Sequence, residues 1–227
     1  MKTWLTAYVL IPLAAYLLGS VPFGLILCKV VKGVDIREHG SRNIGATNAG
    51  RVCGWPFFVV TFLLDFGKGL AVVLGGMLVD RIPSGGGSGP GGFGPELPYS
   101  WLHVAYGVCA ILGHTFPLYV RFKGGKAVAT SFGVFVALAP WSALIALGVW
   151  LVVFLPLHYV SLASMTAAVA APIAFFATHP TDIRGRLPVL LFTIAIAVLV
   201  IVRHRANIGR LLAGNENRIT FRRKKES

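Results

Sequence analysis

Six long apolar runs constrain this chain more than any other feature of its sequence. They cover residues 4–27, 55–79, 100–120, 127–157, 162–178 and 187–202. A helix rises about 1.5 Å per residue, so runs of this length can cross a hydrocarbon core about 30 Å thick. Hydrophobic residues make up 56% of the 227 residues and charged residues only 13%, a balance typical of polytopic membrane proteins. The sequence therefore predicts an all-α integral membrane protein.

The fourth run, residues 127–157, is too long for one ordinary span and has Pro140 near its middle. It is either one tilted helix or a hairpin of two short helices, and the distribution of Lys and Arg decides between them. With a hairpin, sixteen of the 21 Lys and Arg residues fall on one side of the membrane, four fall on the other, and Lys68 lies inside a span. The sixteen lie in 29–51, 121–126 and 203–227. Because cytoplasmic loops carry the excess of Lys and Arg, we expect seven transmembrane helices, with the N-terminus outside and the C-terminus in the cytoplasm.

The formal net charge of +13 would suggest a nucleic-acid partner in a soluble protein. Here the basic residues cluster at the ends of apolar segments, where the positive-inside rule and anionic lipid headgroups account for them, so we expect no nucleic acid. The cysteines Cys28, Cys53 and Cys109 are odd in number and lack metal-ligand spacing, so we expect neither a structural disulfide nor a metal site. No cofactor is expected.

The chain is expected to form a single transmembrane domain over residues 1–227. Within it, residues 83–95 are predicted to be a flexible Gly- and Pro-rich external loop, and residues 203–227 a basic cytoplasmic tail. In this topology the polar segments 29–51 and 121–126 face the cytoplasm together with the tail. The polar motifs of the chain would then meet at one membrane surface.

The segment 40–51, with the sequence GSRNIGATNAGR, is polar, glycine-rich and basic in a chain that is otherwise mostly apolar. Its glycines allow backbone N–H groups to turn toward a ligand. With the surrounding hydroxyls, carboxamides and guanidiniums, such N–H groups suit a phosphate oxyanion. The alternative is a turn between two helices, which glycine, serine and asparagine also favour. The spacing matches neither standard nucleotide-binding fingerprint.

A second candidate phosphate site lies in segment 113–130, where Gly124, Gly125 and Lys126 precede an apolar helix. Such a helix start offers free N–H groups, a positive dipole end and an ammonium group. The alternative is a basic anchor at the membrane edge, which would need the lysine but not two glycines.

Two further pairs of polar residues are candidates for a structural or a functional role. Ser161 and Ser164 follow Pro156 at a helix start, where serine is typically an N-cap. Asp65 and Lys68 are three residues apart near the mid-depth of a span. Because charges there are costly, this pair is either functional or an ion pair that only locks helix packing.

The segment 203–216 follows the last apolar run. His204, Asn207 and Leu211 recur in it at helical spacing, so His204 and Asn207 can both point inward. A juxtamembrane helix that binds anionic lipid would explain the arginines of this segment but not the histidine and asparagine.

Taken together, these segments resemble the bacterial integral-membrane glycerol-3-phosphate acyltransferases that use acyl phosphate as donor, the PlsY family. The matching stretches follow the family's order: 19–24, 33–37, 40–51, 65–69, 113–130, 161–164 and 203–216. The resemblance implies that acyl phosphate and sn-glycerol 3-phosphate give 1-acyl-sn-glycerol 3-phosphate and phosphate, the first step of bacterial phospholipid synthesis. It also implies a multi-pass protein of the bacterial cytoplasmic (inner) membrane with its site facing the cytoplasm, surrounded by membrane lipids and supplied by a peripheral enzyme that produces acyl phosphate.

The same resemblance implies which residues form the site. Acyl phosphate would be bound by Ser41, Asn43, Gly45, Thr47 and Asn48. Glycerol 3-phosphate would be bound by Arg51, Lys126, Ser164, His204 and Asn207. The expected catalytic residues are Ser41, Arg51, Lys126, His204 and Asn207, and the expected supporting residues are Asp65, Lys68, Gly124, Gly125 and Glu216. The family pattern has glycine where this chain has Arg42 and Ala127.

Acyl phosphate is an activated mixed anhydride whose leaving group needs no protonation, so the site must mainly neutralise two phosphates and orient a hydroxyl. No histidine is followed five residues later by aspartate, which argues against the acyltransferases that depend on a His–Asp general base. The proton acceptor is either a substrate phosphate oxygen or His204. Two other classes compete: a transporter or flippase for a phosphorylated small molecule or lipid, and a non-catalytic lipid-binding scaffold. Transporters usually contain repeats, and a scaffold would not need two glycine-rich loops.

Overall fold

The structure is a computed structural model that describes residues 5–80 and 101–219. Every regular element within these ranges is a helix, which confirms the all-α expectation. The predicted loop 83–95 and the end of the predicted tail lie outside the described residues. The elements are η1 (Thr6–Leu10), α2 (Ile11–Ser20), α3 (Phe23–Lys32), α4 (Ala46–Cys53), α5 (Trp55–Asp80), α6 (Trp101–Thr115), η2 (Leu118–Val120), α7 (Val128–Leu138), α8 (Pro140–Leu157), α9 (Val160–Thr178), α10 (Leu187–Arg203) and α11 (Arg205–Leu212).

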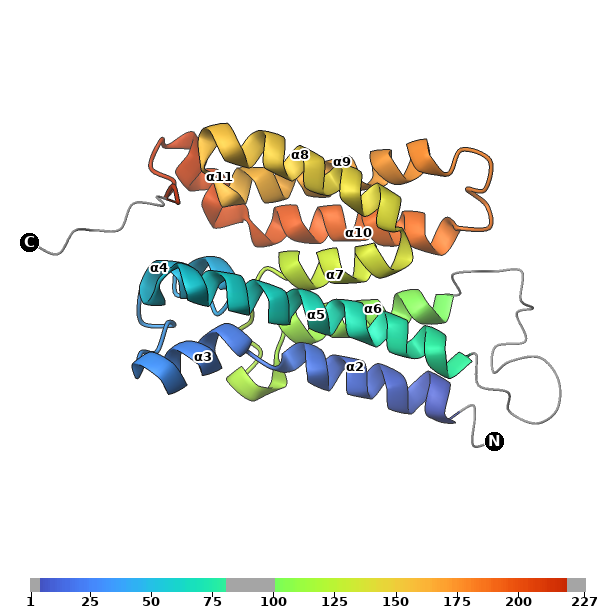
Figure 1. Ribbon diagram of the computed structural model, residues 1–227, viewed down its shortest axis with the longest axis horizontal. Helices are drawn as coiled ribbons and strands as arrows, with labels where there is room; N and C mark the ends of the chain where they lie inside the picture. The colour runs from blue at the N-terminus through green and yellow to red at the C-terminus, as the bar shows by residue number, and fades with distance from the viewer. Residues whose placement is uncertain (1–4, 81–100, 220–227) are drawn as a thin grey trace, which may run out of the picture.

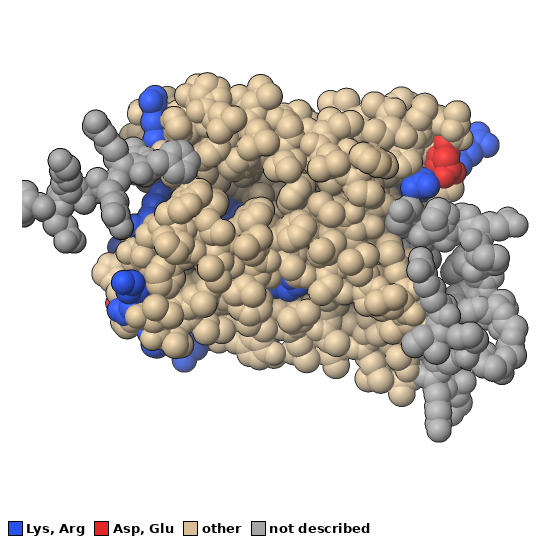
Figure 2. All heavy atoms as spheres, in the orientation of Figure 1, with Lys and Arg blue, Asp and Glu red and all other residues tan. Residues whose placement is uncertain are grey.

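The long helices run side by side along one axis, and the short helices α3, α4 and α11 lie together at one end (Figure 1). Helix α2 packs against α6, α5 packs against α7, and α9 lies between α8 and α10. Figure 2 shows Lys and Arg side chains at the end formed by α3, α4 and α11, and a smaller group beside acidic residues at the opposite end.

The outer surface of the bundle is apolar, as expected for helices that face lipid. Trp141, Val152 and Ile173 are each more than 60% exposed, at 72%, 74% and 67%. Among the described residues, three helices are long and apolar enough to cross a membrane, and two bent helix pairs raise the number to five by length and composition. The protein therefore has the helices of an integral membrane protein. The seven-span count remains a prediction.

The fourth apolar run is divided at Ala139 into α7 and α8, with Pro140 at the first position of α8. Proline is favoured at that position because the N–H it lacks would have no partner inside the helix. Helix α8 turns back along α7 (Figure 1), as a hairpin requires. The first run is also interrupted, since α2 and α3 meet at an angle of 41°.

Helices α5 and α7 approach to backbone contact because glycines line their interface. A Cβ atom at Gly69 would lie 2.2 Å from the carbonyl oxygen of Thr130, and one at Gly133 would lie 2.1 Å from that of Phe66. Small residues allow such close approach between membrane helices. This contact fixes the start of α7, and therefore the Gly-Gly-Lys segment before it, relative to α4 and α5.

Candidate active site

A cavity of about 130 Å³ opens at the end of the bundle where α4, α11 and the start of α7 meet. All ten residues expected to bind a substrate line it: Ser41, Asn43, Gly45, Thr47, Asn48, Arg51, Lys126, Ser164, His204 and Asn207. They come from four separate parts of the chain: 41–51, 126, 164 and 204–207. The structure thus brings together every residue that the sequence assigned to the two substrates, although the role of each stays a prediction.

The loop before α4 is held in shape by Asn48, which is 1% exposed. Its amide nitrogen donates to the carbonyl oxygens of Ile36 (2.8 Å), His39 (3.2 Å) and Asn43 (2.9 Å), and its side-chain oxygen accepts from Ser41 N (2.8 Å). Asn48 therefore builds the loop with both ends of its amide. The contact of Asn48 with acyl phosphate stays a prediction.

Helix α4 begins at Ala46, after Gly45, and both residues line the cavity with Thr47. The first N–H groups of a helix have no partner within it and carry the positive end of the helix dipole. An anion in the cavity would meet this end.

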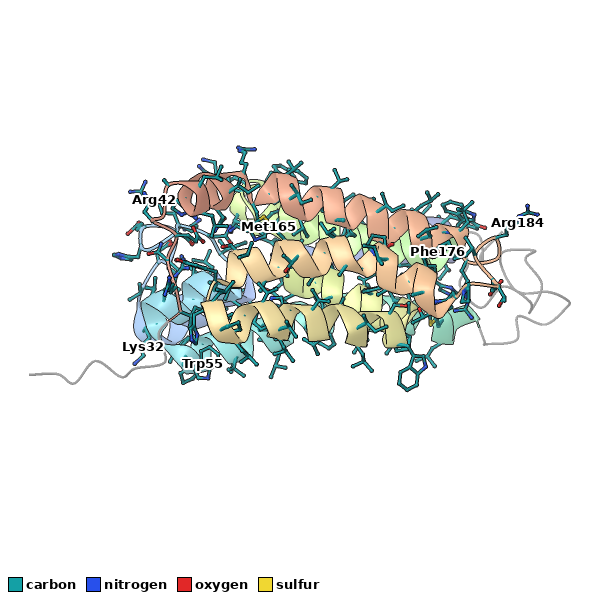
Figure 3. All side chains as sticks on the ribbon, turned by 90° about the horizontal axis from the view of Figure 1, so that it is seen from above. Lys32, Arg42, Trp55, Met165, Phe176 and Arg184 are labelled. Carbon is teal, nitrogen blue, oxygen red and sulfur yellow. The ribbon has the colours of Figure 1, made fainter. Side chains whose placement is uncertain are left out.

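Arg42 lies outside the cavity lining and is exposed, and Figure 3 shows it at the end of the bundle. Its φ of 57° and that of Ala127, also 57°, are left-handed conformations that glycine adopts without strain. These are the two positions where the resembled family has glycine. The chain therefore keeps the glycine-like backbone at both positions despite the substitutions.

Arg51 projects from α4 into the cavity, where its guanidinium group makes few hydrogen bonds. One terminal nitrogen donates to the carbonyl oxygen of Asn217 at 3.4 Å, while Nε is buried without a hydrogen-bond partner. Burial also lowers the pKa of Arg51, although a guanidinium stays charged at any physiological pH. A desolvated cation with an unused donor is suited to an anionic ligand.

Lys126, Asn207 and Glu216 form a continuous hydrogen-bonded chain on the other side of the cavity. The Lys126 ammonium donates to Asn207 Oδ1, and Asn207 Nδ2 donates to Glu216 Oε1 at 2.6 Å. Glu216 also accepts from Ser161 Oγ (2.8 Å) and Arg210 Nε (2.7 Å). Burial alone would raise the pKa of Glu216, but these three hydrogen bonds outweigh it and lower the pKa.

Glu216 reaches the cavity because the chain after α11 folds back toward α9, where Ile219 N donates to the carbonyl oxygen of His158 at 3.0 Å. Ser161 belongs to this network through its hydrogen bond to Glu216. The predicted serine N-cap is wrong. The N-cap of α9 is Tyr159, without a side-chain capping bond.

His204 occupies the break between α10 and α11 and is 3% exposed. Its Nδ1 lies 2.7 Å from the carbonyl oxygen of Val200. A carbonyl can only accept, so Nδ1 carries the proton and Nε2 keeps its lone pair. Burial, followed by the nearby Lys126 charge, lowers the pKa of His204 to about 4. His204 therefore presents a neutral imidazole with one acceptor nitrogen.

An apolar cavity of about 440 Å³ continues from the polar one into the bundle. The two share five residues: Phe58, Phe62, Val128, Trp150 and Ser164. Trp150 Nε1 donates to Ser164 Oγ at 3.3 Å at this boundary. The arrangement places a polar, positively charged end beside an apolar space, as an amphiphile with an anionic head requires.

The predicted pair Asp65 and Lys68 is an ion pair with an Nζ–Oδ1 distance of 2.7 Å, and both side chains are buried. His114 joins it, with Nδ1 at 2.9 Å from Lys68 Nζ and 3.4 Å from Asp65 Oδ1. Asp65 and His114 reach the cavity wall. The sequence singled out the pair but assigned no role to His114, because the pair lies on α5 and His114 lies on α6, 46 residues beyond Lys68 in the chain.

The fold and the site define an integral membrane protein with a cation-lined pocket for anionic groups beside an apolar cavity. Residues 9–214 match the glycerol-3-phosphate acyltransferase family, and the chain belongs to that family. Its glycerol-3-phosphate acyltransferase relative from Salinibacter ruber is 43% identical over 213 residues, covering 92% of this chain and 90% of the relative. The relative from Thermosynechococcus vestitus is 44% identical over 214 residues, covering 92% and 94%.

Two solved structures of PlsY, an integral membrane glycerol 3-phosphate acyltransferase, share the fold. The glycerol 3-phosphate form superposes with a TM-score of 0.78 at 40% identity, covering 93% of this chain and 95% of that chain. The lysophosphatidic acid form gives a TM-score of 0.76 at 39% identity with the same coverage. The resemblance inferred from the sequence motifs is confirmed.

Proposed function

We propose that this chain transfers an acyl group from acyl phosphate to sn-glycerol 3-phosphate, forming 1-acyl-sn-glycerol 3-phosphate and inorganic phosphate at the start of phospholipid synthesis. The observation that carries the proposal is the junction of the two cavities at Ser164, Trp150 and Val128. One side offers Arg51 and Lys126 to phosphate groups, and the other is apolar enough for an acyl chain. The glycerol 3-phosphate and lysophosphatidic acid forms of PlsY support the acceptor and the product.

The donor is proposed to lie against the first loop, with its phosphate at Ser41, Asn43, Gly45, Thr47 and Asn48. The N-terminus of α4 supports this choice, since its free N–H groups and dipole favour an anion. The acyl chain would extend into the apolar cavity lined by Phe58 and Phe62. The carbonyl carbon would then sit at the boundary between the two cavities.

The acceptor is proposed to bind through Arg51, Lys126, Ser164, His204 and Asn207. Arg51 and Lys126 would hold its phosphate, because both are partly buried cations and Arg51 has an unused donor. His204 Nε2 would accept a hydrogen bond from the attacking hydroxyl. Holding a phosphate and a hydroxyl at fixed positions is the main contribution that such a reaction needs from a protein.

In the reaction the hydroxyl oxygen forms a bond to the acyl carbonyl carbon, and the bond from that carbon to the phosphate oxygen breaks. The hydroxyl proton passes to a phosphate oxygen. Burial holds the pKa of His204 at about 4, whereas a phosphate monoester has a second pKa of about 6. A substrate phosphate oxygen is therefore the stronger base, and His204 orients the hydroxyl.

The seven-helix topology is proposed with the N-terminus outside, the C-terminus in the cytoplasm and the pocket facing the cytoplasm of the bacterial inner membrane. The uneven distribution of sixteen against four basic residues supports it. Figure 3 shows Lys32 and Arg42 at the end that holds the pocket and Arg184 at the opposite end. The whole chain would act as one catalytic domain. Membrane lipids surround it, and a peripheral enzyme would deliver acyl phosphate.

The experiment that tests the proposal uses purified protein in detergent or lipid nanodiscs with acyl phosphate. Phosphate should be released only when glycerol 3-phosphate is present, because the acceptor supplies the attacking hydroxyl. A transporter or flippase would move its substrate without such release. Helices α4 and α11, which line the pocket, lie at one end of the bundle (Figure 1), and this position favours the enzyme, since transporter sites usually lie near the membrane midplane.

A further inference from the structure

The segment Gly124–Ala127 carries Lys126 into the pocket and is held from two sides. On one side, Gly125 N donates to the carbonyl oxygen of His114 at 3.1 Å. The His114 ring lies directly against the same glycine, since a Cβ atom at Gly125 would be 2.1 Å from His114 Nε2. The segment therefore rests on His114 through both its backbone and its ring.

His114 is itself fixed in place. Lys68 Nζ lies 2.9 Å from its Nδ1 and 2.7 Å from Asp65 Oδ1, and it also donates to the carbonyl oxygen of Val21 at 3.2 Å. An ammonium group can only donate, so His114 Nδ1 accepts from Lys68 and its proton sits on Nε2, which lies against Gly125. The ion pair of Lys68 and Asp65 thus holds His114 in the position against which the Gly124–Ala127 segment packs.

On the other side, Arg203 at the end of α10 covers the same two glycines. Its Nη2 donates to the carbonyl oxygens of Gly124 (3.1 Å) and Gly125 (2.8 Å). Its guanidinium carbon lies 5.8 Å from the centre of the Phe116 ring, which restricts its direction. Arg203 is not among the described residues that line the pocket. Its contacts are with the backbone that carries Lys126.

We propose that Arg203 is a positioning residue, which holds the Gly124–Gly125 backbone against His114 so that the Lys126 ammonium stays aligned with the phosphate of the acceptor. Arg203 directly precedes His204. The end of α10 therefore sets the position of His204, which would contact the hydroxyl of glycerol 3-phosphate, and of Lys126, which would contact its phosphate. Misplacement of a reacting group by about 1 Å can cost about a hundredfold in rate. This inference rests on the proposed function and adds to it a residue that no substrate need touch.

The test compares Arg203→Met with Arg205→Met, which removes the same charge from an exposed position two residues away. Hydrogen exchange of segment 122–128 is measured without substrate, alongside kcat, KM for glycerol 3-phosphate and thermal unfolding. We expect Arg203→Met to speed exchange in 122–128, with α5 and α8 unchanged, and to lower kcat about tenfold to a hundredfold. Arg205→Met should match the wild type in every measurement.

A variant that keeps the charge separates positioning from simple attraction of the substrate. Arg203→Lys retains a cation but loses the planar guanidinium, so it should stay impaired in kcat. Wild-type activity in Arg203→Lys, or a raised KM with unchanged kcat and unchanged exchange in Arg203→Met, would overturn the proposal. Faster exchange throughout the bundle would also overturn it, because Arg203 would then be structural only. If the wild type lacks acyltransferase activity, the proposed function fails, while the exchange result still decides whether Arg203 holds the segment.

Discussion

The Lys126 ammonium donates a hydrogen bond to the side-chain oxygen of Asn207, which lies 81 residues later in the chain. The contact joins the segment before α7 to α11, and Asn207 passes it on to Glu216. A cation that the protein holds by one neutral acceptor keeps most of its charge available to a ligand. The phosphate of the acceptor would complete the coordination of Lys126 rather than displace a carboxylate from it.

Replacement of Lys126 separates a phosphate ligand from a membrane anchor. Lys126→Ala is expected to abolish most activity, with kcat falling as well as affinity, because two anions must be aligned together. Lys126→Arg should also be clearly impaired, since a planar, longer guanidinium misplaces the phosphate. Lys123→Ala is the matched control, because it removes a basic residue from the same loop outside the pocket lining. Near-normal turnover in a folded Lys126→Ala protein would exclude this loop from the active site.

The pH dependence of the reaction should report the same ammonium group. Burial, aided by the arginines nearby, lowers the pKa of Lys126 to about 8 in the free protein. The ammonium is charged below this pKa and neutral above it, so kcat/KM for glycerol 3-phosphate should fall as pH rises through about 8. Bound phosphate favours the charged form, so the fall in kcat should occur at higher pH. A kcat/KM that stays flat to about pH 10, the range of an ordinary lysine, would contradict this role.

Two residues of the first loop should respond differently to truncation. Thr47→Ala removes a hydroxyl at the cavity wall, and we expect a loss of about 1–3 kcal/mol in kcat/KM for acyl phosphate with unchanged thermal stability. Asn48→Ala removes four hydrogen bonds within the loop, so it should also speed hydrogen exchange over residues 36–45. Arg42→Ala, at an exposed position, should behave as the wild type. Unchanged kinetics in Thr47→Ala would leave that residue a structural role only.

The topology can be tested by thiol labelling of intact cells in a background without the native cysteines. A cysteine at Gly87 should react with an impermeant reagent from outside, and one at Lys224 should not, because the basic ends of the helices face the cytoplasm. Both positions lie outside the described residues. Labelling at position 224 in intact cells would refute the seven-helix arrangement.

Much of the fold follows from the sequence, because apolar runs and turn residues are local signals. The polar character of segment 40–51 needed no partner elsewhere in the chain to be recognised. The break near Pro140 needed more, because only the distribution of Lys and Arg along the whole chain favoured a hairpin over one tilted helix. Two expectations about local structure did not hold or were incomplete. Ser161 bonds to Glu216 rather than capping α9. His204 and Asn207 keep the expected helical spacing at the start of α11, whose N-cap is His204, but the break of 59° between α10 and α11 was not expected.

The contacts that organise the site could not be read from the sequence, because they join residues far apart in it. Arg203 reaches Gly124 across 79 residues, and His114 meets Lys68 across 46. In the sequence, Arg203 looks like one more basic residue at a membrane edge, and His114 like a histidine at a helix end. Both residues contact the backbone of Gly124 and Gly125, where the missing side chains allow a close approach. This approach becomes visible only when the helices are packed together.

The most direct test of the account measures both products from one reaction. Purified protein receives labelled glycerol 3-phosphate with either acyl phosphate or an acyl thioester of coenzyme A or carrier protein, and 1-acyl-glycerol 3-phosphate and phosphate are both quantified. The account predicts that acyl phosphate gives the two products in equal amounts, that thioesters give none, and that Lys126→Ala loses both products together. Efficient use of a thioester, or phosphate release from acyl phosphate without acylated product, would contradict it.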